Sequence, residues 1–348
     1  MALQTNPMLL VSLGAILSSV TRLFPWVPRK LRRVAFEKHI PSIMSTETTL
    51  KAVVELGKEQ SGEQALQAAE AVLREVEARM SVWMGVTELA RFNAAGAGEK
   101  VPLSAETLSV LRIAQEITKQ TEGAFDPTCR PVLEFWRECS AADREPNSGK
   151  LSRALDRVGW HLIRLHERSA EKLQDGISVD LGGIAKGYAV ERAAEAMRNA
   201  GACGGMVQSG GDLYVFGPAE HSSKWGIGIN DPFDPQGKLR PEVLFLTNRA
   251  VSTSGNYRRF FAIRDRRHSH ILDPRNGKPV DAVPQVTTVA GSAMISEGWS
   301  TALSVLGPEG LTLLPAGVEA MLITHDGSGP QVHKSEHFDE LVCPQLSA

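Results

Sequence analysis

The residues best suited to chemistry in this 348-residue sequence lie in five short segments. In the first, Val179 to Ala189, an apolar run ends in Asp180, two glycines follow, and a helix is expected to begin. Such a turn leaves backbone N–H groups at a helix start, where they can bind anionic oxygen. Lys186 in the first turn adds a positive charge for a phosphate. An ordinary strand-to-helix connection capped by Asp180 would have the same sequence.

Two further segments combine glycines with polar side chains. In Gln208 to Tyr214, a glycine pair lets a ligand or another backbone come close, and Asp212 can accept a hydrogen bond. A hairpin turn explains these glycines equally well. In Val251 to Arg259, three hydroxyl residues precede Gly255 and can donate to phosphate oxygens or to a ring edge. The same composition is typical of turns.

The last two segments hold candidates for acid–base chemistry and for metal binding. His268 to Gly277 places two histidines before an Asp-Pro-Arg-Asn-Gly turn, and a histidine there can take a hydroxyl proton near neutral pH. A lone histidine is more often structural. In Ser296 to Ala302, Glu297 and Thr301 point the same way if the segment is helical. Their oxygens suit Mg²⁺, although a surface acid and a helix-interior threonine would have the same spacing.

Alternating helices and strands must position these segments. Apolar residues recur three and four apart in 61–80 and 104–121, and each stretch opens on a serine suited to capping, so both are predicted helices. The other expected elements are strands at 48–56, at 177–181 and repeatedly within 206–289, helices at 184–199 and 295–305, a loop at 143–149, and a final helix and strand within 310–324. No repeat or low-complexity linker divides the chain.

Composition gives no support to several functions. The apolar share of 42% and the charged share of 22% are ordinary for globular proteins. A net charge of −2 gives no indication of nucleic-acid binding. None of the four cysteines forms a C-x-x-C pair, so neither a zinc site nor a dithiol redox site is indicated.

The N-terminal segment differs from the rest. Its largely apolar stretch, Met8 to Val20, is shorter than the roughly 20 residues of a membrane span but has the length of a signal-peptide core. No Lys or Arg precedes it, and basic residues follow it. We therefore interpret residues 1–37 as an N-terminal extension, and the sequence leaves open whether it is a signal or anchor segment. Residues 38–345 are expected to form one catalytic domain.

Taken in order, these segments resemble the signature blocks of the FAD:protein FMN transferase family, also known as ApbE or thiamine-biosynthesis lipoprotein-like proteins. Three more fragments fit. Met44-Ser45-Thr46 resembles the family's M-G-T, residues 80–93 resemble its M-S-x-Y…S-E-L-S-R-x-N block, and residues 123–128 match G-A-F-D-P-T. The resemblance runs from about residue 38 to about 342, and many ordered blocks are far more specific than one motif.

The resemblance implies an α/β (α+β) fold related to the T-fold, with FAD lying in a cleft. It implies Mg²⁺ as cofactor, FAD as substrate, and His270 as the catalytic base. The implied FAD contacts are Met44, Trp83, Ala124, Phe125, Asp126, Asp180, Lys186 and Ile271. The implied metal positions are Gly183, Glu297 and Thr301, with Ser300 beside them.

The implied reaction is magnesium-dependent transfer of the FMN half of FAD to a Ser or Thr hydroxyl of an acceptor, with release of AMP. The implied partner is a separate redox protein with a D-x-x-[ST]-G-A-[ST]-like segment, which this chain lacks. No nucleic acid is implied. The resemblance favours the periplasmic side of the inner membrane, with association through the N-terminal segment left open and the cytoplasm not excluded.

The sequence departs from the family pattern at three places. Ser296-Glu297-Gly298 stands where A-D-A is usual, Ser45 replaces a glycine, and residues 84–87 replace an Asp/Pro-rich turn. The extra methylene of Glu297 shifts the carboxylate relative to Asp, and Mg²⁺ tolerates little displacement. Two alternatives therefore stay open: hydrolysis of FAD to FMN and AMP, and flavin binding without catalysis.

Overall fold

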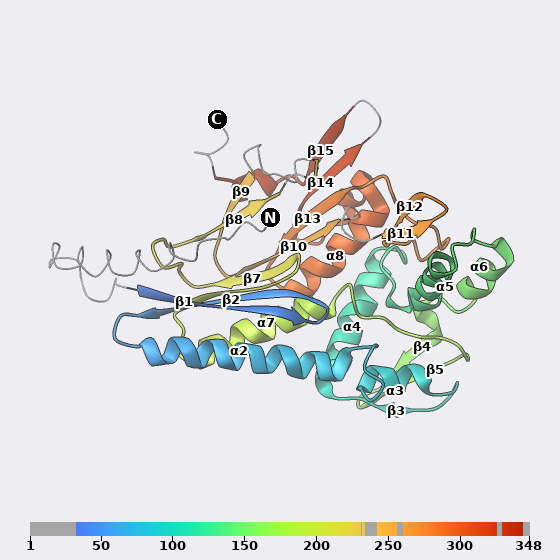
Figure 1. The fold of residues 1–348 in the computed structure, drawn as a ribbon, viewed down its shortest axis with the longest axis horizontal. Coiled ribbons are helices and arrows are strands. Elements are labelled where there is room, and N and C mark those ends of the chain that lie inside the picture. Colours follow the sequence, from blue (N-terminus) through green and yellow to red (C-terminus); the bar gives the residue numbers. More distant parts are fainter. Residues whose placement is uncertain (1–32, 231, 234–241, 256–259, 326–328, 344–348) are drawn as a thin grey trace, which may run out of the picture.

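An eight-stranded antiparallel sheet forms the centre of the computed structural model, which describes residues 33–230, 232–233, 242–255, 260–325 and 329–343 (Figure 1). The strand order is β1-β2-β6-β7-β10-β13-β14-β15, and every neighbouring pair is antiparallel. The strands are β1 Arg33–Ile43, β2 Thr46–Glu55, β6 Gly204–Ser209, β7 Asp212–Phe216, β10 Arg249–Gly255, β13 Gln285–Ala290, β14 Glu319–His325 and β15 Pro330–Lys334.

Alternate residues of these strands enter two cores, one on each face of the sheet. Leu50 of β2 and Leu322 of β14 belong to the larger core, together with residues of the helices. Val53 of β2 and Ile323 of β14, at positions of opposite parity, belong to a smaller core that also contains residues of β8 and β9. This is the period of two expected for strands covered on both sides. The covering elements are α2 Glu59–Met80, α7 Ala185–Asn199, α8 Ala293–Leu306, β8 Trp225–Ile229 and β9 Glu242–Leu246.

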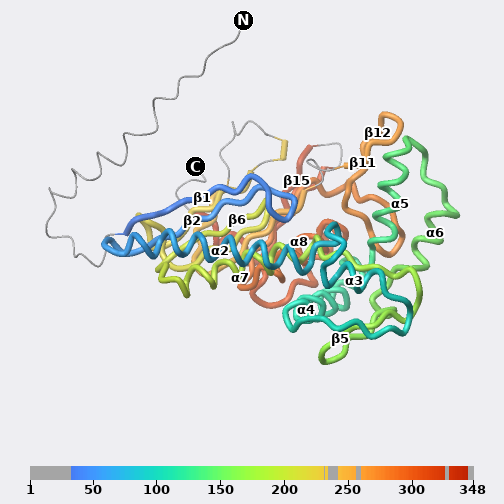
Figure 2. Tube along the Cα trace, turned by 60° about the horizontal axis from the view of Figure 1, so that its bottom comes forward, coloured from blue at the N-terminus to red at the C-terminus, as the bar shows by residue number. Residues whose placement is uncertain are grey.

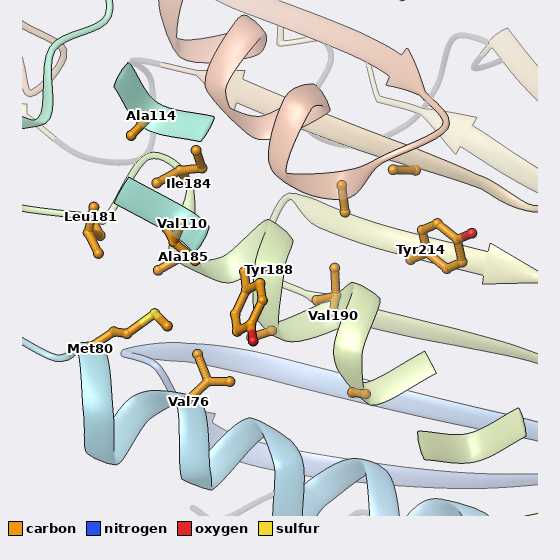
Figure 3. Packing of buried hydrophobic residues seen from close by; sticks show 14 of the residues in the cluster. Val76, Met80, Val110, Ala114, Leu181, Ile184, Ala185, Tyr188, Val190 and Tyr214 are labelled. Carbon is orange, nitrogen blue, oxygen red and sulfur yellow. The ribbon is translucent and has the colours of Figure 1, made fainter. Parts of the chain in front are cut away.

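Helices α2, α7 and α8 lie along one face of the sheet, and Figure 2 shows α2 following the length of β1 and β2. Figure 3 shows Tyr188 of α7 near Val76 and Met80 of α2, with Val110 of α4 close by. Gly187 lets the start of α7 approach α8, because a Cβ built at this position would lie only 2.6 Å from the carbonyl carbon of Ala293. This contact fixes the first turn of α7 against α8.

Smaller elements complete the molecule at one end of the sheet. Trp136 of α5 stacks on Phe261 of β11 with ring centroids 6.2 Å apart, so a third apolar cluster joins α5 to the β11–β12 hairpin. The remaining elements are α3 Glu88–Ala94, β3 Val101–Pro102, α4 Ala105–Gln120, α5 Arg130–Ala141, α6 Ser148–Leu155, β4 Ile163–Leu165, β5 Ser169–Lys172, β11 Phe260–Ile263 and β12 Arg266–Ser269, with 3₁₀ turns at Pro127–Cys129, Trp160–Leu162, Gly307–Leu313 and Phe338–Leu341.

Most of the predicted elements are confirmed. The helices expected at 61–80, 104–121, 184–199 and 295–305 are α2, α4, α7 and α8, with ends shifted by at most two residues. Ser104 caps α4, since its side chain accepts a hydrogen bond from the Thr107 N–H. The strand expected at 48–56 is β2. The loop expected at 143–149 ends at Asn147, whose side chain caps α6.

The strand predicted at 177–181 is wrong, because this segment pairs with none of the strands in the described part of the chain. Its backbone groups are instead satisfied by side chains and a loop. The Asn93 amide donates to the Val179 carbonyl at 2.8 Å and accepts from the Val179 N–H at 2.7 Å. Lys172 Nζ donates to the Ile177 carbonyl at 3.2 Å, and the Asp180 N–H donates to the Pro127 carbonyl at 2.9 Å.

The N-terminal stretch at 8–20 falls outside the described residues. Within the described ranges, no helix has both the length and the apolar character needed to cross a bilayer. The first described element, β1, begins at Arg33 and pairs with β2 from its first residue. All four cysteines lie within the described residues and are unpaired.

Candidate functional site

A cavity of about 750 Å³ opens at the end of the sheet where the β1–β2 and β6–β7 turns meet the starts of α5 and α7 and one side of α8. This volume lies within the range of typical ligand pockets. Every predicted site residue except Ser300 lines this cavity. The residues come from segments more than 250 positions apart in the sequence, and the fold brings them to one place.

The inner end of the cavity holds a cluster of three charged side chains, Lys186, Asp212 and Glu297. Lys186 Nζ lies 2.7 Å from Asp212 Oδ2 and also forms an ion pair with Glu297 Oε1. The ammonium donates as well to the Gly182 carbonyl at 3.2 Å. Glu297 is only 2% exposed and Asp212 only 5%. Lys186 therefore places one positive charge between two buried carboxylates that would otherwise repel each other.

The Glu297 side chain also caps the N-terminus of α7. Its Oε2 accepts a hydrogen bond from the Gly187 N–H at 2.6 Å, and Ile184 at the N-cap position provides no side-chain cap. A carboxylate at this end of a helix satisfies an unpaired N–H and interacts favourably with the helix dipole. Burial and the negative charge of Asp212 raise the pKa of Glu297, while Lys186 opposes the shift. Burial alone would lower the pKa of Lys186, but the negative charges of Asp212 and Glu297 outweigh that effect and raise it.

Glu297, Thr301 and Gly183 bring hard oxygen groups to one wall. Glu297 and Thr301 are four apart in α8, confirming the predicted shared face. A Cβ built on Gly183 would lie 3.3 Å from Thr301 Oγ1 and 3.2 Å from Phe125, so the Gly183 backbone lies close to both side chains. This set of carboxylate, hydroxyl and carbonyl oxygens fits Mg²⁺. In the described part of the chain, no three His, Cys, Asp or Glu residues form a metal cluster.

Ser300 differs from the other predicted metal residues. Its side chain is fully buried, and its hydroxyl donates to the Glu297 carbonyl at 2.8 Å. Ser254 of β10, which does line the cavity, lies 2.8 Å from the same hydroxyl. Ser300 thus links α8 to β10. The end of the third sequence segment, residues 256–259, lies outside the described residues.

The unusual residues beside Glu297 have local partners. The Ser296 hydroxyl donates to the Thr288 carbonyl at 3.0 Å, and the Thr288 hydroxyl donates to the Ser296 carbonyl at 2.7 Å. Gly298 faces Ile117 of α4, where an added Cβ would lie 2.5 Å from Ile117 Cδ1. Both departures from A-D-A are therefore accommodated by residues of this chain, and α8 remains a regular helix around Glu297.

Two acidic residues predicted at the site, Asp126 and Asp180, also accept hydrogen bonds from backbone N–H groups. Asp126 accepts hydrogen bonds from the Thr128 N–H at 2.8 Å and the Trp160 N–H at 3.1 Å, and burial raises its pKa. Asp180 accepts from the Gly182 N–H at 2.9 Å, which shapes the turn before α7. Both line the cavity, and both fix the segments on which their neighbours sit.

The β1–β2 turn contributes Met44 to the cavity in a left-handed conformation. Met44 and Ser45 have φ values of 51° and 61°, which is typical of a two-residue type I′ hairpin. The Met44 N–H donates to Glu77 of α2 at 2.7 Å, so the turn is tied to that helix. In the β6–β7 turn, which also lines the cavity, Gly210 has φ 61°, and this confirms the hairpin interpretation of the glycine pair.

The two histidines of the fourth segment point to different places. His270 lines the cavity, as does Ile271. The ring of His268 instead lies 5.3 Å from the ring of Trp136, outside the cavity lining. The Asp-Pro-Arg-Asn-Gly turn is confirmed, because the Gly277 N–H donates to the Asp273 carbonyl at 2.7 Å. Trp136 anchors this turn by donating to the Gly277 carbonyl at 2.8 Å.

The mouth of the cavity carries the implied FAD contact Trp83 and two arginines, Arg130 and Arg137, that the sequence did not single out. Trp83 is 62% exposed, and the guanidinium carbons of Arg137 and Arg130 lie 4.5 Å and 5.8 Å from its ring centroid. Both arginines line the cavity together with Leu133. Their spacing of seven residues could have indicated that the two arginines lie on one face of a helix that follows the G-A-F-D-P-T block.

The ApbE family model matches residues 44–322, a range that includes every predicted site residue. The FAD:protein FMN transferase of Klebsiella pneumoniae is 28% identical over 295 residues, which cover 81% of this chain and 83% of that protein. The FAD:protein FMN transferase of Haemophilus influenzae is 32% identical over 248 residues, which cover 69% of this chain and 72% of that protein. A solved structure, the flavin transferase ApbE from Vibrio cholerae, superposes with a TM-score of 0.77 at 26% identity and covers 88% of this chain and 100% of its own.

Proposed function

Because this chain belongs to the ApbE family, we propose that it transfers the FMN moiety of FAD to an acceptor flavoprotein and releases AMP. The observation that carries this proposal is the convergence of the predicted FAD, metal and base residues on a single cavity. Residues from Met44 to Thr301 meet there although no element contains more than a few of them. The cavity therefore supports a site for the dinucleotide and for the attacking hydroxyl together.

In this proposal the pyrophosphate of FAD lies at the inner end, beside the start of α7. Glu297, Thr301 and the Gly183 carbonyl would hold Mg²⁺, which supplies charge neutralisation for the pyrophosphate when it is bound. Lys186 keeps the start of α7 in place through its ion pairs and adds positive charge next to the phosphates. Phe125 and Trp83 offer aromatic surfaces to the rings of FAD.

His270 acts as the base at this site. It removes the proton from a Ser or Thr hydroxyl of the acceptor as that oxygen attacks the FMN-side phosphorus. The new P–O bond joins FMN to the acceptor, the bond between the two phosphates breaks, and AMP leaves with the bridging oxygen. The proton on His270 then passes to solvent. A water molecule in place of the hydroxyl would give FMN and AMP instead.

The test mixes the purified protein with FAD, MgCl₂ and an acceptor carrying a D-x-x-[ST]-G-A-[ST] segment. Transfer gives a fluorescent acceptor on a denaturing gel and an equal amount of AMP, and EDTA abolishes both products. AMP without a labelled acceptor would indicate hydrolysis. Bound FAD with neither product would indicate a flavin-binding protein, and either result would contradict the transferase proposal.

The His270→Asn variant tests the base. Loss of a general base typically costs on the order of 100-fold or more, so we expect transfer to fall at least about 100-fold while FAD affinity, measured by flavin fluorescence titration, stays within about two-fold. His268→Asn is the matched control, since His268 is two residues away and packs on Trp136 outside the cavity. Normal transfer by His270→Asn would remove His270 from this role.

A further inference from the structure

At the cavity mouth, Arg130 forms an ion pair with Glu134, whereas Arg137 forms none with a described residue. Arg137 Nη1 is buried and has no hydrogen-bond partner among the described residues. Burial lowers the pKa of the Arg137 guanidinium, and the positive charge of Arg130 adds to that shift, while Asp180 and Glu134 act against it. Burying part of an unpaired cation is unfavourable, and an incoming anion would offset that cost.

The geometry of this pair is set by the helix and by Trp83. Arg130 and Arg137 lie seven residues apart on the cavity face of α5, and both guanidinium groups approach the Trp83 ring. Arg130 donates through Nε to Glu134 at 2.7 Å, which orients its side chain. Stacking on an aromatic ring fixes the plane of a guanidinium and leaves its edge available for a planar anion such as a carboxylate.

The position of these residues separates them from the inner end of the cavity. Glu297 is 2% exposed, whereas Trp83 is 62% exposed. The adjoining loop carries two further exposed apolar side chains, Met84 at 43% and Val86 at 81%. Exposed tryptophan and methionine beside arginine are typical of protein-binding surfaces. A protein acceptor reaches the cavity from outside, and this loop adjoins Trp83 at the cavity mouth.

We propose that Arg137 and Arg130, held by Trp83, bind a side-chain carboxylate of the acceptor protein close to the hydroxyl that is modified. This inference rests on the proposed function. The exposed apolar loop at 83–86 would contact the same acceptor beside that carboxylate. The cluster thereby selects acceptors with an acidic residue near the modified Ser or Thr, and it takes no part in the bond-making step.

The test compares Arg137→Gln with the wild-type protein on acceptors whose acidic residues near the modified hydroxyl are changed to amides one at a time. With saturating FAD, Arg137→Gln should raise the acceptor KM about ten-fold, the size of one charge-assisted contact, and leave kcat nearly unchanged. On the one amide acceptor that lacks the recognised carboxylate, wild type and variant should have the same raised KM. Arg137→Lys should recover part of the loss, because it keeps the charge without the planar fork.

The matched control is Arg153→Gln on α6, which removes an exposed arginine outside the cavity. It should leave the acceptor KM unchanged, both for the unchanged acceptor and for the amide acceptors. FAD affinity, measured by fluorescence titration, should be equal in Arg137→Gln and wild type, and it also reports folding. If Arg137→Gln weakens FAD binding and leaves the acceptor KM unchanged, the arginines serve a phosphate of FAD and the inference is wrong. If its loss is equal on every amide acceptor, no carboxylate is recognised. A wild-type protein that labels no acceptor contradicts the proposed function, and this inference with it.

Discussion

The charged side chains at the two ends of the cavity differ in how completely they are paired. At the inner end, Lys186 lies between the buried carboxylates of Asp212 and Glu297, and Glu297 also caps α7. At the mouth, Arg130 and Arg137 face an exposed aromatic ring, and one guanidinium nitrogen has no hydrogen bond within the described structure. The inner charges are thus paired within the fold, whereas Arg137 keeps one guanidinium nitrogen without a partner among the described residues. Substitutions at the inner end should therefore change stability and activity together, and those at the mouth should change binding alone.

The largest expected effect comes from Lys186→Met, which leaves two buried carboxyl groups without their cation. Removing one partner of a buried ion pair costs roughly 3–5 kcal/mol, so the free energy of unfolding at pH 8 should fall by about that amount. Urea unfolding followed by circular dichroism measures this change. Arg137→Met, the same kind of change at the mouth, should alter the free energy of unfolding by less than about 0.5 kcal/mol.

The pH dependence of Lys186→Met provides a check on the cause. Glu297 already has a pKa raised from 4.5 to about 8, and removal of Lys186 takes away the group that opposed this rise. A carboxyl whose folded pKa is raised contributes stability below its unfolded pKa and loses it as the pH rises through the folded value. Folded wild-type Glu297 ionises above about pH 8, whereas Glu297 of the variant stays protonated to higher pH. The deficit of the variant should therefore be larger at pH 9.5 than at pH 7, and adding Glu297→Gln should restore part of the stability. A deficit independent of pH would show that lost packing, not charge, is responsible.

The inner end also shows how far sequence reasoning extends. Asp180, Lys186, Glu297 and Thr301 were identified from short motifs, because glycine turns and helix spacing are local properties. The pairing of Asp212 with Lys186 joins two such motifs across 26 residues and depends on which strands become neighbours. The error at 177–181 has the same origin. Its alternating burial resembles a strand, and only the fold shows that the Asn93 amide takes the place of a neighbouring strand.

The next expected effect tests how closely α7 and α8 must approach. In Gly187→Ala the new methyl group would meet the backbone of Ala293, which cannot yield as a flexible side chain can, so we expect a loss of about 2 kcal/mol in the free energy of unfolding. FAD affinity should fall as well, because Lys186 and Glu297 are carried by these two helices.

The control for Gly187→Ala lies at the mouth. Gly85 has no atom within 4 Å of a built Cβ, and its φ is not positive, so Gly85→Ala should change stability by less than about 0.5 kcal/mol. Denaturant unfolding of both variants separates the two outcomes. If both alanines were tolerated equally, the inner end would not depend on close helix packing, and the contrast between the two ends would rest on charge alone.

The mouth was harder to foresee from the sequence. Trp83 was identified through its resemblance to a family aromatic position, but nothing local indicated that Arg130 and Arg137 lie against it, since 47 residues separate Trp83 from Arg130. Exposed side chains leave no periodic apolar pattern, and cation–aromatic contacts depend on how α5 sits relative to the loop after α2. The helices and the Ser104 cap could be predicted, but the cap expected at Ser61 is wrong, because α2 begins at Glu59 after Lys58. The surfaces between the helices could not be predicted.

The smallest expected effect concerns the rim, where Ser45 stands in place of the family's glycine. Ser45 has φ 61°, a left-handed conformation that costs a residue with a Cβ roughly 1 kcal/mol, whereas glycine adopts it readily. Because glycine also gains freedom in the unfolded chain, Ser45→Gly should raise the free energy of unfolding by only about 0.5 kcal/mol. Ser42→Gly in β1, where φ is not positive, should instead lower stability by roughly 0.5–1 kcal/mol. Opposite signs in urea unfolding would show that Ser45 strains a turn that lines the cavity, whereas a loss in both would mean that contacts of the Ser45 side chain outweigh the backbone strain.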